Sequence, residues 1–530
     1  MTGRSFALAL LASLTANLSA AYADEPAKPW RERQRAEAAA LPAPALPAGD
    51  GAVIDRFTAA QWAKHKVAAP AVVDDRTFIR RVYLDVIGLP PTIAQQEEFA
   101  KDARPDKRAR LIDALLADEA AYAEHWMTFW NDLLRNDEQT AIDGLRKPVT
   151  AWLYDSLRKN KPLDEFTAEL LNPGPGGPDG YLKGVNWRGR VNASQTPPIQ
   201  AAQNVAQVFL ASSIKCASCH DSFINKWKLE EAYGLASFFT PTNLEMHRCD
   251  APTGQVVAPK FLFTGLGEVA PKATLAERRA AVAQMVTRPK NPRFARSMVN
   301  RYWKRLLGQG LIEPADDFDS SKLESPLLDW LAHDLMRHDY DVKHTLRLIL
   351  NSKVYQAPIA KPQPEFVVGP TERRLTGEQY LDAVGHVTGA WPKTAVMSAK
   401  VDNPQIRTWR HKKPDALVTA LGRPNREQVC TERNQDSTVL QALELVNGGV
   451  LATRLKDGAR ALLASDLGKE TDHAAVVRTL YLRALGRTPR ANEVALLAPL
   501  LSGANPKDRQ EGWEDVLWVL FQSAEFQFIR

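Results

Sequence analysis

Residues 75–91 read DRTFIRRVYLDVIGLPP, and this stretch decides the fold class. Apolar side chains recur at every fourth position and so share one side of a helix: Phe78, Val82 and Val86. Gly88 then ends the helix, because glycine readily adopts the left-handed backbone that follows a last helical turn. Pro91 suits the first turn of a second helix, where its missing N–H has no intrahelical partner. The stretch therefore predicts a helical hairpin.

The same pattern returns near the C-terminus. Residues 480–489 read LYLRALGRTP and match residues 82–91, VYLDVIGLPP, in the spacing of their Tyr-Leu pair, glycine and proline. We interpret the repeat as a reused structural unit rather than as a site. The alternation of apolar and polar residues that is typical of strands is scarce elsewhere. We therefore expect a mainly α fold with two helical domains and long irregular loops.

Length and charge narrow the class of protein. A chain of 530 residues exceeds what one hydrophobic core usually holds, so two or three domains are expected. The 68 basic and 62 acidic residues give a net charge of +6 and are mixed along the chain. Because nucleic-acid-binding proteins usually concentrate basic residues on one face, this mixture argues against nucleic acid as a partner.

The N-terminus predicts an exported protein. Arg4 precedes an apolar run from Phe6 to Leu18, and Ala21-Tyr22-Ala23 offers a small-x-small cleavage site. This order is typical of a secretory signal peptide, here residues 1–23. The apolar run is too short for a membrane span, and no other segment approaches that length. We therefore expect a periplasmic or otherwise extracytoplasmic protein with no transmembrane segment after cleavage.

Composition along the rest of the chain predicts its division into domains. Residues 24–52 are rich in Ala and Pro and are expected to form a flexible leader. A first helical domain is expected at residues 53–250, with a Gly- and Pro-rich irregular loop at residues 172–198. A Pro-rich linker at residues 251–274 then leads to a C-terminal helical domain at residues 275–530.

The sharpest chemical signal is the sequence CASCH at residues 216–220. Covalent attachment of c-type haem requires two cysteines in a C-x-x-C spacing, followed by a histidine that ligates the iron from the proximal side. Cys216, Cys219 and His220 meet this requirement within the first predicted domain. The predicted export strengthens the case, since haem is attached outside the cytoplasm. The sequence therefore predicts one covalent haem c.

Three other uses of these cysteines stay open. Cys216 and Cys219 would join His247 and Cys249 in a tetrahedral zinc site, as C-x-x-C followed by H-x-C. A redox-active dithiol is a second alternative, although its usual βαβ setting is missing. A disulfide between the two neighbouring cysteines is the third, and this spacing strains it.

Several side chains are candidates for the sixth iron position and its surroundings. Met246 and His247 follow the motif closely enough to fold back over the iron. His125 and Met127 are less local candidates. Three cations of the irregular loop are candidates for pairing with the haem propionates: Lys183, Arg188 and Arg190.

The remaining chemistry-bearing residues predict little. Cys249 and Cys430 are a candidate disulfide in an oxidising compartment. The carboxylates of residues 316–324 lack the register of an EF-hand and are expected in a solvated turn. Three histidines have no paired ligand spacing and are expected on the surface: His333, His338 and His344.

Two long segments resemble known families. Residues 75–239 resemble the secreted cytochrome-like domain of planctomycete-type proteins, DUF1549. Its matching segments are RRVYLDVIGLPP from Arg80 to Pro91, the pair His125-Trp126, and Cys216 to Phe239 with CHD and KW. Residues 291–485 resemble the partner domain, DUF1553. Its matching segments are NRYW from Asn300, GQGL from Gly308, LDWL from Leu328 and GRP from Gly422.

The resemblance implies an exported bacterial protein whose first half is cytochrome c-like, in a family without an established activity. Many relatives carry a separate N-terminal cytochrome c domain, whereas this chain has a single C-x-x-C-H. Any electron is therefore expected to arrive from a redox partner protein rather than along a row of haems within the chain.

Three functions follow as hypotheses. The first is a mono-haem redox protein, in which the second domain docks a partner or substrate. The second is a non-redox binding or scaffold protein with a zinc or structural Cys/His site. The third is an enzyme acting on extracytoplasmic glycans, with the haem as electron outlet. No catalytic pair stands out in the sequence, so whether the protein is an enzyme stays open.

Overall fold

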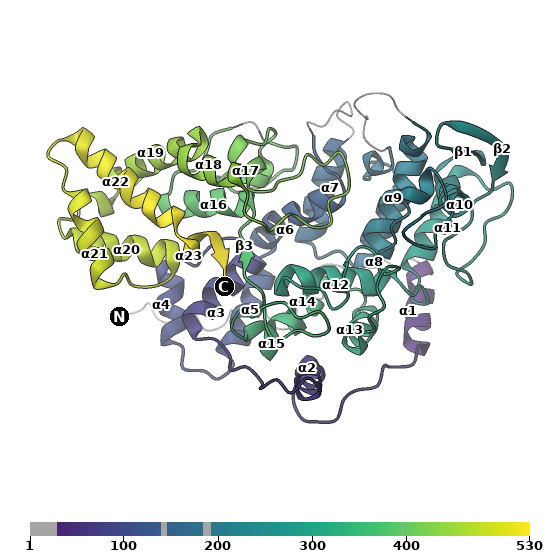
Figure 1. Cartoon of the computed structure of the whole chain (residues 1–530), viewed down its shortest axis with the longest axis horizontal. Coiled ribbons are helices and arrows are strands. Elements are labelled where there is room, and N and C mark those ends of the chain that lie inside the picture. The colour runs from purple at the N-terminus through teal and green to yellow at the C-terminus, as the bar shows by residue number, and fades with distance from the viewer. Residues whose placement is uncertain (1–28, 139–145, 184–191, 395) are drawn as a thin grey trace, which may run out of the picture.

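The computed structural model describes residues 29–138, 146–183, 192–394 and 396–530 (Figure 1). The predicted signal peptide, residues 1–23, lies outside the described residues. The described part of the chain is mainly helical, as the sequence predicts. Its strands form only two short antiparallel pairs, β1 with β2 and β3 with β4.

A first hydrophobic core unites the helices from α2 to α15. The helices up to that point are α1 (Pro29–Ala40), α2 (Val53–Lys64), α3 (Asp75–Val86), α4 (Ile93–Lys101), α5 (Lys107–Ala117), α6 (Glu119–Leu133), α7 (Arg146–Arg158), α8 (Leu163–Leu171), α9 (Pro197–Leu210), α10 (Leu229–Ala236), α11 (Leu275–Thr287), α12 (Phe294–Leu307), α13 (Pro326–Arg337), α14 (Val342–Asn351) and α15 (Lys353–Gln356).

A second hydrophobic core is built almost entirely from residues after 374. Its helices are α16 (Gly377–Thr388), α17 (Ala416–Ala420), α18 (Val439–Asn447), α19 (Gly449–Ala464), α20 (His473–Leu485), α21 (Ala491–Leu497), α22 (Pro506–Gln522) and α23 (Ala524–Gln527). The C-terminal strand β4 (Phe528–Ile529) returns to pair with β3 (Arg373–Arg374) between the two cores.

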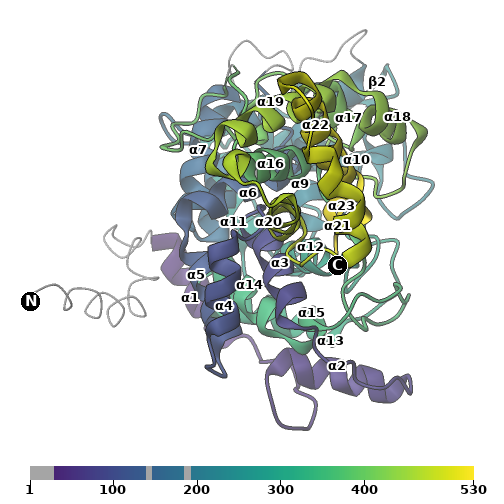
Figure 2. The ribbon, with the colours of Figure 1, turned by 90° about the vertical axis from the view of Figure 1, so that its left-hand side faces the viewer.

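The two cores lie along the long axis of the molecule. Helices α19 to α22 gather at one end in Figure 1, and the strands β1 (Leu244–Arg248) and β2 (Ala251–Val257) lie at the opposite end beside α10. Figure 2 looks onto the first of these ends, with α20 and α22 in front of the helices of the first core. Helices α11 to α15, which follow the predicted linker, pack in the first core and not in the second.

The repeated hairpin forms twice, and the two copies contact each other. Gly88 after α3 and Gly486 after α20 both have left-handed backbone, with φ of 73° and 70°. The side chain of Arg80, in α3, donates to the carbonyl oxygen of Ala484 at 2.7 Å. The repeat therefore joins the first core to the second.

The prolines of the repeat lie earlier than predicted. Pro91 precedes the N-cap of α4, which is Thr92, and Pro489 likewise lies two residues before α21. The Thr92 hydroxyl accepts from the backbone N–H of Gln95, and the Gln95 side chain accepts from the N–H of Thr92. This capping box fixes the start of α4. The proline therefore belongs to the turn that precedes the helix and not to the first turn of the helix itself.

The predicted flexible leader differs from the structure, because residues 29–40 form helix α1. Arg31 is buried and donates to Asp164 of α8, with Nε 2.9 Å from the carboxylate oxygen. Its Nη1 also lies 3.5 Å from Glu165. Composition suggested a solvated segment, but a long-range ion pair holds this helix against the first core.

The predicted linker at residues 251–274 also differs from the structure, because it begins with strand β2. This strand pairs antiparallel with β1, and Cys249 and Asp250 form the turn between them. Nearly all of β2 is exposed. An exposed strand needs no alternation of apolar residues, and for this reason the sequence pattern did not reveal it.

Within the described ranges, no helix combines the length and apolar character that crossing a bilayer requires.

Candidate functional site

The CASCH motif lies on an irregular segment between α9 and α10. Ala211 ends α9 in a left-handed conformation, and a short 3-10 turn, η4 (Cys216–Ser218), carries the first cysteine. Ala217 and Ser218 are buried, and the Ser218 hydroxyl donates to the carbonyl oxygen of Ile214 at 2.9 Å. The inner residues thus hold the turn in place, while Cys216 and Cys219 remain partly exposed.

The ring of His220 has one nitrogen engaged and one available. Its Nδ1 lies 2.7 Å from the carbonyl oxygen of Asp221 and donates to it, so that Nε2 is the nitrogen left for another partner. The ring of Phe223 lies against the imidazole, with 4.6 Å between the ring centroids. Metal-ligating histidines commonly donate their second N–H to a backbone carbonyl in this way.

The tip of the β1–β2 hairpin contacts the motif. The backbone N–H of Cys249 donates to the carbonyl oxygen of Cys219 at 2.8 Å, and Cys249 itself adopts a left-handed φ of 54°. Burial, and then the neighbouring Cys249 side chain, raise the pKa of the Cys219 thiol. The structure thus brings a third cysteine to the haem motif.

The candidate sixth ligands are divided between two places. Met246 and His247 belong to β1, with Met246 buried in the first core and His247 partly exposed. His125 and Met127 lie in α6 and are buried. A Cβ atom added at Gly88 would lie 2.3 Å from His125 Nδ1, so this histidine packs against the end of α3.

The two remaining cysteines have different neighbours, and all four thiols of the chain are free. Cys249 lies against Cys219, as described above. Cys430 Sγ lies 3.3 Å from the carbonyl oxygen of Glu432, and burial, with the nearby Asp132 carboxylate, raises its pKa to about 11. The predicted pair Cys249–Cys430 is therefore not bonded in this structure.

The irregular loop is partly described. It includes a 3-10 turn, η2 (Asp179–Tyr181), in which Tyr181 is buried. Lys183 forms an ion pair with Asp179. Arg188 and Arg190, the other two candidate partners for haem propionates, lie outside the described residues.

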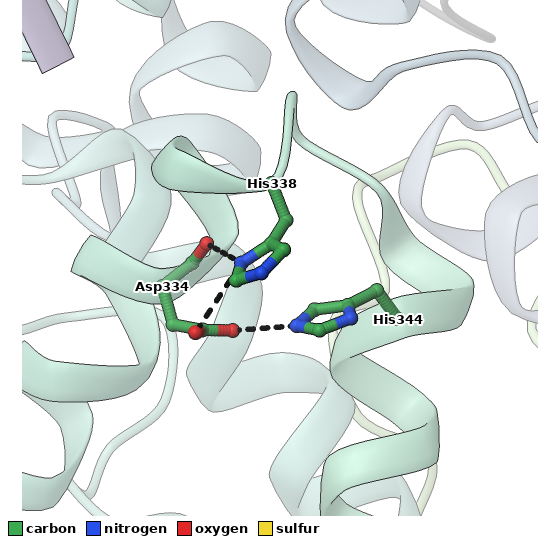
Figure 3. Close-up of side chains that lie close together, drawn as sticks. All are labelled: Asp334, His338 and His344. Carbon is green, nitrogen blue, oxygen red and sulfur yellow. Dashed lines mark hydrogen bonds and ion pairs between the residues drawn. The ribbon is translucent and has the colours of Figure 1, made fainter. Parts of the chain in front are cut away.

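The candidate zinc ligands are not gathered into one site. Among the described residues, one group of three or more potential ligand side chains has its ligand atoms within 4.8 Å of one another, and it does not include the motif. It consists of Asp334 and His338, at the end of α13, and His344 in the first turn of α14 (Figure 3). The two histidine rings stack with centroids 3.8 Å apart, and His344 Nε2 lies 2.9 Å from Asp334.

This Asp-His-His group corrects the expectation of isolated surface histidines. Asp334 and His338 have the i, i+4 spacing that places two side chains on one face of a helix, and this signal is present in the sequence. His344 comes from the next helix, and only the packing of α14 against α13 brings it close. All three side chains are at least partly exposed.

Two of the carboxylates of residues 316–324, Asp316 and Asp319, differ from their prediction, whereas Glu324 is exposed as predicted. Asp319 is almost fully buried and accepts from Trp227 Nε1 at 2.9 Å and from Arg293 at 2.6 Å. Asp316 accepts from Gln207 and Thr431. These carboxylates therefore tie the segment after the motif to the rest of the first core, where they do not form a solvated turn.

A large cavity lies between the two cores and not beside the motif. It measures about 650 Å³ and is lined by α6, α12, residues 359–376 and residues 430–435. No local motif marks it, because its walls come from four distant segments of the chain. Patterns in the sequence therefore give no sign of this cavity.

Comparison with known proteins identifies the relatives of the chain. Residues 53–244 match the PSCyt2 family model, described as a protein of unknown function (DUF1549). Residues 278–501 match the PSD1 family model, described as a protein of unknown function (DUF1553). No curated protein and no solved structure matches the chain. The chain therefore belongs to the proteins of unknown function in which a DUF1549 domain is followed by a DUF1553 domain.

Proposed function

We propose that the protein is an extracytoplasmic mono-haem redox protein that exchanges electrons with a partner protein. Cys216 and Cys219 are the attachment thiols, and His220 is the proximal ligand. The observation that carries this proposal is the geometry of His220, whose Nδ1–H is held by the Asp221 carbonyl while Nε2 stays available. Haem bound there would supply one-electron transfer, at a potential set by the sixth ligand, the burial of the site and its hydrogen bonds.

The surroundings of the motif fit a flat apolar group. Phe223 and Ile224 lie three and four residues after the motif, and they are 88% and 67% exposed. Large apolar side chains that remain this exposed next to each other are usually covered by a ligand or partner. The buried residues Ala217 and Ser218 hold the turn rigidly, so that the two thiols and the imidazole keep their relative positions.

The hairpin tip supplies the candidate sixth ligands. The hydrogen bond from Cys249 to Cys219 holds β1 next to the motif, and His247 and Met246 precede Cys249 by two and three residues. His247 is partly exposed and Met246 is buried, so His247 can reach the iron with less rearrangement. A histidine in this position gives a lower potential than a methionine.

One observation favours the zinc or structural alternative. The backbone N–H of Cys249 donates to the carbonyl oxygen of Cys219 at 2.8 Å, so two of the four candidate zinc ligands are neighbours in space. A zinc site would need Cys216 and His247 to join them. In that case the protein would be a binding or scaffold protein, and the motif would stabilise the hairpin instead of carrying electrons.

A spectrum and a mass decide between the two proposals. The full chain is produced in a periplasm with the haem-attachment machinery, and its reduced absorbance spectrum and intact mass are recorded. We expect a c-type spectrum and the added mass of one haem. A colourless protein of unmodified mass that holds one zinc would overturn the haem proposal.

Two cysteine variants make the test specific. Cys219→Ser removes one of the two attachment thiols, so haem should no longer be attached through both. Cys249→Ser should leave the haem attached, since that thiol lies outside the motif. A matched loss of one zinc equivalent in both variants would instead support the zinc site. His220→Ala should lose the c-type spectrum while the reduced thiols remain detectable.

A further inference from the structure

The cavity between the two cores has the size of a small-molecule site. Its volume of about 650 Å³ falls within the ~300–1,000 Å³ that is typical of ligand pockets. Helices α6 and α12 of the first core form one side, and β3 with the segment 430–435 forms the other. A ligand in this cavity would therefore contact both cores at once.

The lining of the cavity carries an excess of positive charge. Seven lysine and arginine side chains line it, against three carboxylates. All three carboxylates already have cationic partners: Asp132 accepts from Arg433, Glu432 from Lys304 and Glu372 from Arg530. Carboxylates outside the lining pair with three of the seven cations: Asp85 with Arg373, Glu313 with Lys304 and Glu378 with Arg433.

Arg305 of α12 has the clearest unused hydrogen-bonding capacity. In the described chain its guanidinium donates one hydrogen bond, a long one of 3.5 Å to the Gln379 side chain. The carboxylates nearby are engaged elsewhere, since Asp85 accepts two hydrogen bonds from Arg373. Burial, and then the charge of Arg373, lower the pKa of Arg305 to about 10, so that it remains charged at neutral pH.

Arg301 adds a second guanidinium from the same helix. It lies one helical turn before Arg305 and lines the same cavity. Its Nε and Nη2 donate to the backbone carbonyls of Val208 and Gln207, while its buried Nη1 has no hydrogen-bond partner. Like charges at i, i+4 repel each other, and an anion near both would remove this cost.

We propose that this cavity binds a small organic ligand through an oxyanion, a carboxylate or a sulfate ester, with Arg305 as the principal contact. The Arg305 guanidinium makes a single long hydrogen bond through Nη2, so most of its N–H groups remain to face the oxygens of such a group. Phe129, Leu133 and Ile359 give the cavity an apolar wall for the carbon skeleton of the ligand. The proposal does not depend on whether haem is attached to the motif.

The test uses the purified full chain and three sugars of the same size. Glucuronate carries a carboxylate, glucose 6-sulfate carries a sulfate ester, and glucose carries neither. Binding is measured by titration calorimetry and by the shift of Tm at neutral pH, with sodium chloride at matched ionic strength as the reference. We expect saturable binding of at least one charged sugar and none of glucose. The stronger of the two identifies the oxyanion.

Variants on the two sides of the cavity locate the site. Arg305→Gln removes the charge with little change of shape and should weaken binding about tenfold, the size expected for a charge-assisted hydrogen bond. Arg305→Lys should restore part of the affinity. Arg374→Gln, in β3, tests the opposite wall if Arg305→Gln does not fold. Arg296→Gln is the matched control, since Arg296 lies on the same helix but pairs with Asp329 outside the cavity.

Three results would overturn the proposal. One is the absence of any saturable effect of glucuronate and glucose 6-sulfate beyond that of chloride. Another is equal binding of glucose, which would show that the cavity recognises the sugar and not the charge. The third is unchanged affinity in both Arg305→Gln and Arg374→Gln.

Discussion

The CASCH motif and the arginine-lined cavity are built in opposite ways. The motif uses residues that are neighbours in the sequence, at a partly exposed turn near the β1–β2 hairpin. The cavity gathers residues from four distant segments between two cores, and many of its charged neighbours are buried. Side chains at the partly exposed motif can change without disturbing a hydrophobic core. The buried charged groups beside the cavity, in contrast, hold the two cores together. Variants of the two regions should therefore differ in their cost to stability.

One loop connects the two regions. Lys215, next to the first motif cysteine, donates to the side chain of Gln428 at 2.7 Å. The chain then continues through Cys430 to Arg433, which line the cavity. A ligand that moves this loop would thus change the surroundings of the motif.

The largest effect is expected from Glu378→Gln in the buried network. Glu378 is almost fully buried and accepts two hydrogen bonds from Arg433, at 2.6 and 3.0 Å. Its substitution leaves Arg433, Arg423 and Arg426 with only Asp132 and Asp137 as buried countercharges, and we expect the free energy of unfolding to fall by about 3–5 kcal/mol. Urea denaturation measures this, with Glu372→Gln, a surface ion pair, as the control that should cost less than about 1 kcal/mol.

The same residue predicts a dependence on pH. Burial opposes the ionisation of Glu378, but Arg433, Arg423 and Arg426 lower its pKa to about 2. Because the folded pKa lies below the ordinary value of 4.5, its contribution is present above pH 4.5 and is lost as the pH falls toward 2. Glu378→Gln should lack this part of the acid dependence. An unchanged dependence of the unfolding free energy on pH would show that the buried charges around Glu378 do not stabilise the contact between the two cores.

The two copies of the hairpin offer a matched pair of smaller effects. Gly88→Ala and Gly486→Ala both place alanine in left-handed backbone, which costs about 1 kcal/mol. At Gly88 the new methyl group would also meet His125 Nδ1 at 2.3 Å, whereas at Gly486 the nearest atom is 3.8 Å away. We expect a total cost of about 3 kcal/mol at Gly88 and about 1 kcal/mol at Gly486 in thermal unfolding. Equal losses of stability in the two variants would show that the surroundings of Gly88 can adjust to an added methyl group.

His125 should make the stability of the protein sensitive to mild acid. Burial, with the charges of Arg305 and Arg407, holds its pKa well below 6.5. The unfolded chain takes up this proton near pH 6.5 and the folded chain does not, so stability should fall by about 1 kcal/mol per pH unit below 6.5. His125→Asn should reduce the slope of stability against pH between pH 6.5 and 5. His65→Asn, away from the contact between the two cores, should not. Denaturant midpoints across this range measure both.

The smallest effect on folding is expected at the motif. In protein made without the haem-attachment machinery, Cys216→Ser should change the free energy of unfolding by less than about 1 kcal/mol, because the side chain is partly exposed. The same variant should lose covalent attachment of haem when the machinery is present. A loss of more than about 2 kcal/mol in the first experiment would favour a structural, metal-bound role for the cysteines.

Local patterns in the sequence predicted the local structure well. The spacing of Phe78, Val82 and Val86 predicted α3, and Gly88 and Gly486 end their helices as expected. Leader helix α1 and strand β2 were missed, because an ion pair to Asp164 and a hairpin partner stabilise them. The first of these contacts joins residues far apart in the chain, and the second joins strands that have no apolar pattern. The periodicity of the sequence reveals neither.

The sequence by itself determined the helical class, the family and the candidate haem ligands Cys216, Cys219 and His220, because each depends on residues a few positions apart. Only the tertiary structure decided that Cys249 meets Cys219 and that His344 joins Asp334 and His338. It also decided where the cavity lies. Guanidinium groups such as those of Arg305 and Arg433 look like ordinary surface charges in the sequence, and only the packing of the two cores gathers them around one cavity.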